Sequence, residues 1–218
     1  MNTTMRRFPG SAAIEGVRRR VRGSYEIDEW GLDPELVALG DPLLSLRWEI
    51  DVEGTENLPV LGGAVLVFNR RLGISEPWVL ARGIRRATGR FVRTVGIVDV
   101  PPVGPLLRRF GGVVDRPEEI AGLLRAGQLV GLPMGHSLGS DVGDLRVDRI
   151  EAALATSAPV VPVAMLGREF GRGWRIVIGT PVVPKRRGGP LAAVELTEAV
   201  RAGVQRLLDA ADPPGLWL

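Results

Sequence analysis

The segment 135–139 reads Gly-His-Ser-Leu-Gly and places the chain's single histidine, His136, directly before Ser137. The pattern G-x-S-x-G is typical of the nucleophile elbow of α/β-hydrolases, where a serine is exposed at a tight strand-to-helix turn. A serine nucleophile needs a base to take its proton, and in those enzymes the histidine follows the serine along the chain. Because no histidine follows Ser137, the sequence argues against a serine hydrolase.

The composition excludes several other kinds of functional site. The chain has no cysteine and one histidine, which rules out disulfides and cysteine nucleophiles and argues against zinc ligation, so we predict no metal site. Hydrophobic residues make up 45% of the 218 residues, and the net charge is only +3. These values are typical of a globular protein, and we expect no nucleic-acid partner.

The basic residues gather near the N-terminus, where six arginines fall between residues 6 and 22. We therefore divide the chain into a basic arm, 1–24, and a single α/β domain, 25–218. A solvated terminus is the favoured interpretation of the arm, and contact with anionic lipid headgroups is the alternative. Without a stretch suited to a signal peptide or a membrane span, we expect a cytoplasmic protein and leave peripheral membrane contact open.

From residue 48 onward, short apolar runs alternate with amphipathic segments. This alternation predicts a mixed, mainly parallel central sheet with helices on both faces. Before it, Asp33-Pro34 predicts the start of a short helix, 34–39. We expect strands over 48–52, 63–68, 91–95, 113–114, 129–132, 160–166 and 174–178. We expect helical segments over 77–86, 103–110, 117–126, 147–157 and 191–211.

Six segments resemble, in order and spacing, the glycerolipid acyltransferase family, which includes the lysophosphatidate acyltransferases. The segments are 50–59 (IDVEGTENLP), 63–69 (GAVLVFN), 103–116 (VGPLLRRFGGVVDR), 123–133 (LLRAGQLVGLP), 158–164 (APVVPVA) and 176–182 (IVIGTPV). The region from the first of these segments to the last covers about two thirds of the chain. The resemblance implies an acyltransferase-like fold.

The first catalytic block departs from the family pattern. The family has a histidine, four residues and an aspartate after the strand, and the histidine takes the proton of the acceptor hydroxyl. Here Arg70 occupies the histidine position and Ser75 the aspartate position, while a one-residue slip would place Glu76 there instead. A guanidinium has no lone pair with which to accept a proton, so the resemblance implies that no catalytic residue is intact.

The second block departs as well. Where the family has Phe-Pro-Glu-Gly-Thr-Arg-Ser, this chain has Met134 for the glutamate, then Gly135 and His136, and Ser137 for the arginine. Arg116 matches the family's phosphate-contacting arginine, with Arg108 and Arg109 nearby; the alternative is that Arg116 forms a structural ion pair with Asp115 or Glu119. We expect a substrate site to be lined by Arg116, Met134, Gly135, His136 and Ser137.

Two functions follow from the resemblance. In the first, the domain is catalytically degenerate and binds an acyl chain or a lysolipid, or acts as a regulatory partner of a protein that the sequence does not identify. In the second, a rebuilt site with His136 or Glu76 as base moves an acyl group from acyl-CoA or acyl carrier protein to a lysolipid or another alcohol. Neither function requires a bound cofactor.

Overall fold

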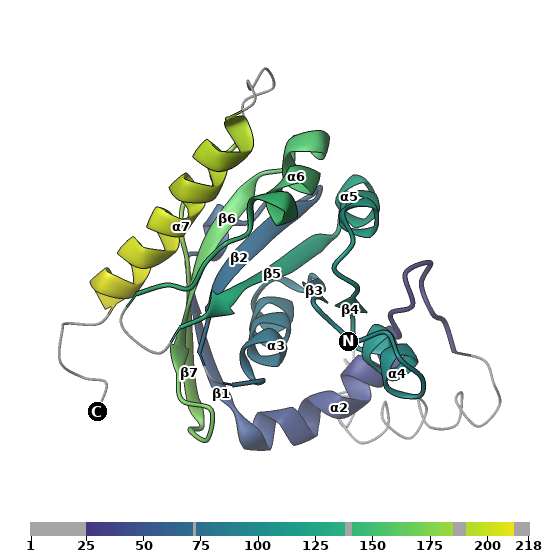
Figure 1. Cartoon of the computed structure of the whole chain (residues 1–218). Helices are drawn as coiled ribbons and strands as arrows, with labels where there is room; N and C mark the ends of the chain where they lie inside the picture. Colours follow the sequence, from purple (N-terminus) through teal and green to yellow (C-terminus); the bar gives the residue numbers. More distant parts are fainter. Residues whose placement is uncertain (1–24, 72, 138–140, 185–190, 212–218) are drawn as a thin grey trace, which may run out of the picture.

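A seven-stranded sheet forms the centre of the described structure, in the order β1-β7-β6-β2-β5-β3-β4 (Figure 1). The structure is a computed structural model that describes residues 25–71, 73–137, 141–184 and 191–211, so the basic arm at 1–24 lies outside the described residues. The strands are β1 (Glu49–Glu53), β2 (Ala64–Arg70), β3 (Val92–Val95), β4 (Gly112–Val113), β5 (Leu129–His136), β6 (Val160–Gly167) and β7 (Gly173–Ile178).

The sheet is mixed and mainly parallel, as predicted. Strands β6, β2, β5, β3 and β4 run parallel to one another. Strand β7 is antiparallel to β6, and β1 follows the direction of β7. The first six residues of β2, in the middle of the sheet, are all buried, which explains its continuous apolar run.

Helices cover both faces, also as predicted (Figure 1). The helices are α2 (Pro34–Arg47), α3 (Glu76–Thr88), α4 (Val103–Arg109), α5 (Pro117–Arg125), α6 (Val147–Thr156) and α7 (Ala192–Ala211), with a 3₁₀ turn, η1, at Thr55–Asn57. One apolar core lies between the sheet and helices α5, α6 and α7. A second core lies between the other face and α3, with Leu44 of α2 packed against it. None of the described helices is both long and apolar enough to cross a membrane.

Helix α2 is longer than predicted and spans Pro34–Arg47. The predicted start is confirmed, because Asp33 caps the helix by accepting a hydrogen bond from the Leu36 N–H at 2.8 Å. The predicted end at residue 39 is wrong: the helix continues through Gly40 and Pro42. Proline in a helix interior removes one backbone hydrogen bond, and tertiary contacts at the ends of α2 compensate for it.

Those contacts tie α2 across the carboxyl edge of the parallel strands (Figure 1). At its beginning, the Asp33 N–H donates to the Arg109 carbonyl at 3.0 Å. At its end, the Arg47 guanidinium donates to the carbonyls of Glu169 and Gly171, both at 2.6 Å, in the turn between β6 and β7. Because parallel strands present their carboxyl ends at one edge, the segments that follow β2, β5 and β6 meet beneath this helix.

Candidate functional site

Two of the predicted site residues are neighbours at the carboxyl edge. Arg70 ends β2, His136 ends β5, and the two are register partners in the parallel pair. The Ser137 N–H donates to the Arg70 carbonyl at 3.0 Å, which fixes this register. Since neighbouring strands lie about 4.8 Å apart, the exposed His136 stands next to the position where the resembled family carries its base.

Arg70 and Glu76, which flank the short loop between β2 and α3, both have unsatisfied polar atoms. Arg70 Nη2 donates to the Gly73 carbonyl at 3.1 Å, and Glu76 Oε1 accepts from the Arg71 N–H at 3.0 Å. In contrast, Arg70 Nε and Glu76 Oε2 are buried and have no hydrogen-bond partner. Buried polar groups are normally paired, so this donor and this acceptor each leave a hydrogen bond unmet at the position of the family's first catalytic block.

Ser75, at the family's aspartate position, is held by a residue that the sequence did not single out. Its hydroxyl donates to Glu169 Oε1 at 2.8 Å, and its N–H donates to Glu169 Oε2 at 3.1 Å. A Cβ at Gly73 would overlap Glu169 Oε2, so glycine is needed for this approach. The partners lie 94 residues apart, and the convergence of the segments after β2 and β6 is the only signal in the sequence that could have paired them.

An apolar groove of about 560 Å³ opens beside Ser75 and Glu169. This volume is within the range of small-molecule sites, which are concave and mostly apolar with a few polar groups. The groove was not predicted, because its wall is divided among α2, α3, the end of α4 and the β6–β7 turn. Its apolar lining is formed by Leu43, Leu44, Trp48, Ile74, Trp78, Phe110 and Phe170.

The residues of the family's second catalytic block lie partly in the core and partly at the surface. Met134 is 2% exposed and packs in the core beneath α5, α6 and α7, which disfavours direct contact with a ligand. The Gly135 N–H donates to the Asp144 carbonyl at 2.7 Å. The Ser137 hydroxyl donates to the Asp141 carbonyl. Helix α6 begins only at Val147, so Ser137 does not occupy the sharp strand-to-helix turn of a nucleophile elbow.

Arg116 is exposed at the start of α5, and the predicted alternative of an ion pair with Asp115 or Glu119 is wrong for both carboxylates. Asp115 pairs with Arg149 at 2.5 Å, and Glu119 pairs with Arg108 at 2.7 Å. No ion pair joins Arg116 to either carboxylate in the described part of the chain. Its guanidinium is therefore accessible at the carboxyl edge, past the end of β4.

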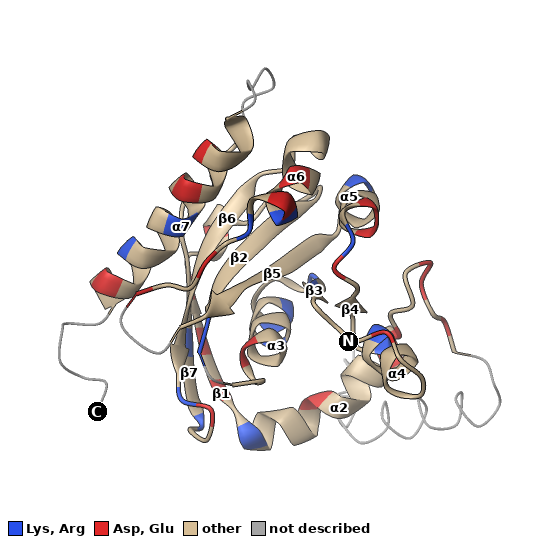
Figure 2. Cartoon of the chain, viewed as in Figure 1, with Lys and Arg blue, Asp and Glu red and all other residues tan. Residues whose placement is uncertain are grey.

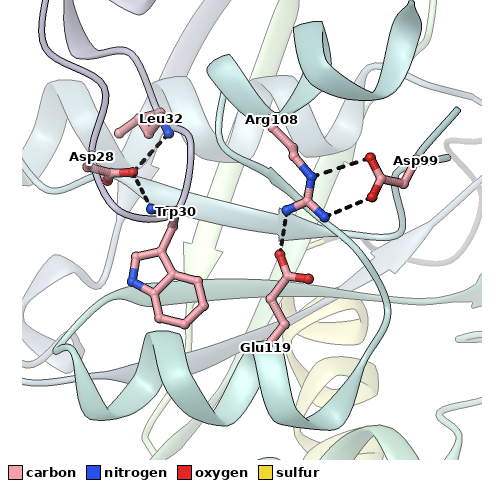
Figure 3. A network of polar contacts seen from close by, with 6 residues as sticks. All are labelled: Asp28, Trp30, Leu32, Asp99, Arg108 and Glu119. Atoms are coloured by element: carbon pink, nitrogen blue, oxygen red, sulfur yellow. Dashed lines mark hydrogen bonds and ion pairs between the residues drawn. The ribbon is translucent and has the colours of Figure 1, made fainter. Parts of the chain in front are cut away.

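The two arginines near Arg116 are both engaged. Arg108 binds Asp99 and Glu119 together, as Figure 3 shows, and these hydrogen bonds raise the pKa of its guanidinium. The Arg109 guanidinium lies 5.6 Å from the centre of the Tyr25 ring. Neither side chain is as available to an anion as Arg116. Within the described ranges, no group of three or more histidine or acidic side chains is arranged to hold a metal ion.

No family model matches the chain. An uncharacterised protein of Mycobacterium leprae is 28% identical over an alignment 265 positions long, gaps included, which covers 90% of this chain and 71% of that protein. Uncharacterised proteins of Mycobacterium bovis and Mycobacterium tuberculosis are 26% identical, covering 90% of this chain and 73% of their own length.

Among solved structures, the chain resembles the 1-acyl-sn-glycerophosphate acyltransferase of Thermotoga maritima. The TM-score is 0.62 at 21% sequence identity, and the match covers 95% of this chain and 90% of the other. This likeness confirms the acyltransferase-like α/β fold that the six sequence segments predicted.

Proposed function

We propose that this domain binds an acyl chain or a lysolipid in the apolar groove and lacks acyl transfer by the route of the resembled family. The observation that carries the proposal is the position of the groove, which opens at Ser75 beside the family's first catalytic block. Seven apolar side chains suit an alkyl chain, while Ser75, Glu169 and Arg47 at the same groove offer polar contacts to a headgroup.

The side chains at the catalytic positions support the loss of that route. Arg70 cannot accept a proton at neutral pH. The Ser75 hydroxyl donates its hydrogen bond to Glu169, and a neutral hydroxyl cannot be the charged partner that stabilises a protonated base. General-base catalysis contributes about 10²–10⁴-fold to rate, and its removal is expected to leave little transfer.

The proposal is tested by mass spectrometry of lipids extracted from the purified protein, together with thiol release from acyl-CoA in the presence of lysolipid acceptors. We expect a co-purified fatty acid or lysolipid and thiol release at background. A restored variant needs Arg70→His and Ser75→Asp together with Glu169→Gln, because an aspartate at position 75 would otherwise face the Glu169 carboxylate. Robust turnover by the wild-type chain would contradict the proposed degeneracy.

A second candidate function is an active transferase with His136 as base, and the register pairing of His136 with Arg70 favours it. The imidazole would take the proton of an acceptor hydroxyl, and the oxygen would attack the thioester carbonyl. An ester would form and the thiolate would leave, taking up the proton. The imidazole has no hydrogen-bond partner within the described residues, so substrate would have to orient it.

The His136→Ala variant separates the two functions. If His136 is the base, its loss is expected to lower turnover by about 10²–10⁴-fold. Ser137→Ala is the matched control, because this neighbour donates its hydroxyl to the Asp141 carbonyl and has no role in the proton transfer. Turnover that His136→Ala leaves unchanged would rule out the imidazole and leave Glu76 as the remaining base.

We also propose that the groove faces a membrane surface. Leu43, Leu46, Ile74 and Phe170 are all strongly exposed, from 72% to 94%, and three of them line the groove. Figure 2 shows that α2 carries basic charge at its C-terminal end, beside the β6–β7 turn. Exposed apolar side chains next to basic ones are typical of surfaces that bind anionic bilayers, so a lipid could enter the groove directly from the bilayer.

A further inference from the structure

A small cavity of about 40 Å³ lies next to the groove, between α2 and α3. It shares Leu44, Trp78 and Phe110 with the groove, so the same three side chains line both spaces. Since about 10–15 Å³ holds one water molecule, the cavity has room for about three atoms of that size. The two spaces therefore adjoin at these three side chains, and the smaller one fits one small polar group.

Two arginines of α3 line this cavity and have unsatisfied donors. The Arg82 side chain is 4% exposed, and its Nη1 lies 3.4 Å from Asp41 Oδ1. That contact is an ion pair without a hydrogen bond, because Arg82 Nε and Nη1 are both buried with no hydrogen-bond partner. Arg85 Nη1 is likewise buried with no hydrogen-bond partner. The Arg85 guanidinium lies 4.7 Å from the centre of the Phe91 ring.

The charge of the cavity favours an anion. Two guanidinium groups and one carboxylate line it, and that carboxylate, Asp41, is 39% exposed and partly hydrated. Burial lowers the pKa of the Arg82 guanidinium, because Asp41 offsets only part of the cost of burying this positive charge. A second anion inside the cavity would supply the acceptors that the N–H groups lack.

We propose that the cavity binds the carboxylate of a free long-chain fatty acid, with the alkyl chain lying outward along the groove. The guanidinium fork matches the two oxygens of a carboxylate, and the cavity is too small for a glycerol phosphate headgroup. The chain would pass Leu44, Trp78 and Phe110 and reach Ile74 and Phe170 at the mouth. The inference rests on the proposed function, since it takes the groove as the place of the alkyl chain and adds the identity and direction of the ligand.

The test compares dodecanoate with dodecanol, which has the same chain and no charge, by isothermal titration calorimetry on the full chain. We expect the wild-type chain to prefer dodecanoate by about 10–100-fold, the range of a buried charge-assisted hydrogen bond. Arg82→Met and Arg85→Met should each reduce this preference about tenfold or more while leaving dodecanol binding unchanged. Arg86→Met is the matched control, because this exposed arginine follows Arg85 on α3 and does not line the cavity.

Thermal unfolding checks that each variant is folded, and Arg85→Met, which is less buried, carries the test if Arg82→Met does not fold. Equal binding of dodecanoate and dodecanol by the wild-type chain would overturn the carboxylate site and leave the groove proposal standing. A preference that survives both Arg82→Met and Arg85→Met would also overturn it. Failure of both ligands to bind would overturn the groove as well as the cavity.

Discussion

Replacing Asp28 with alanine should lower the free energy of unfolding by about 3–5 kcal/mol, the typical cost of breaking a buried ion pair. The Arg93 side chain, in β3, is 1% exposed, and its Nη2 pairs with Asp28 Oδ2. Arg93 Nε and Nη1 are buried without another hydrogen-bond partner. Loss of the carboxylate therefore leaves a buried cation without its ion-pair partner among the described residues, and urea denaturation would measure the effect.

Asp28 has a second role that adds to this loss. Its Oδ1 accepts the backbone N–H groups of Trp30 and Leu32, at 3.0 and 2.9 Å (Figure 3), and so shapes the segment that leads into α2. The matched control is Glu53→Ala, which breaks an exposed pair with Arg175 and should cost about 0–1 kcal/mol. A loss from Asp28→Ala no larger than that of Glu53→Ala would show that Arg93 does not depend on this partner.

The double change of Asp28 to alanine and Arg93 to methionine separates charge from packing. It removes the buried cation together with its partner, and replacing a whole buried pair by apolar side chains is often close to neutral. We therefore expect the double variant to be more stable than Asp28→Ala alone. The difference between the two is the cost of the uncompensated guanidinium.

Changing both Leu46 and Phe170 to serine should weaken binding to anionic vesicles by more than about 100-fold. Each large apolar side chain contributes about 1.5–3 kcal/mol when it leaves water, and each 1.4 kcal/mol corresponds to about a tenfold change in affinity. Leu46 is 74% exposed and Phe170 is 94% exposed, so neither contributes much to the folded core. Co-sedimentation with vesicles that contain an anionic phospholipid would measure the loss.

The control for this experiment lies at the opposite edge of the sheet. Val60 and Leu61 are 87% and 86% exposed in the turn before β2, where the parallel strands begin. Changing both to serine removes a similar apolar area from a surface that does not include the groove, and vesicle binding should stay within about twofold, since surface changes have small effects. Equal losses in the two double variants would refute a membrane contact specific to the carboxyl edge.

The regular elements were largely predictable because their apolar periodicity is local. The predicted strand 160–166 is observed as Val160–Gly167, and the predicted helix 117–126 as Pro117–Arg125. The second half of α2 was missed because Gly40 and Pro42 lower helix propensity, while the compensating contacts of Arg47 come from the β6–β7 turn. Local patterns carry no information about such tertiary contacts.

The candidate site was less predictable for the same reason. Asp115 and Glu119 are close to Arg116 in sequence, yet they pair with Arg149 and Arg108, because the fold directs neighbouring side chains to different partners. The likeness to the acyltransferase family located Arg70 and Ser75 at one edge. It could not reveal Glu169 or the groove, which depend on segments that the motifs do not include.

The way α2 is fastened has a consequence for hydrogen exchange. The helix is held through Asp33 at its beginning and Arg47 at its end, and between them it has no buried residue and contains Pro42. Segments with few buried contacts open locally at a lower free energy than the sheet that supports them. The amide protons in the middle of α2 should therefore exchange before those of β2, and lifting this one helix would uncover the groove along its side while the sheet remains folded.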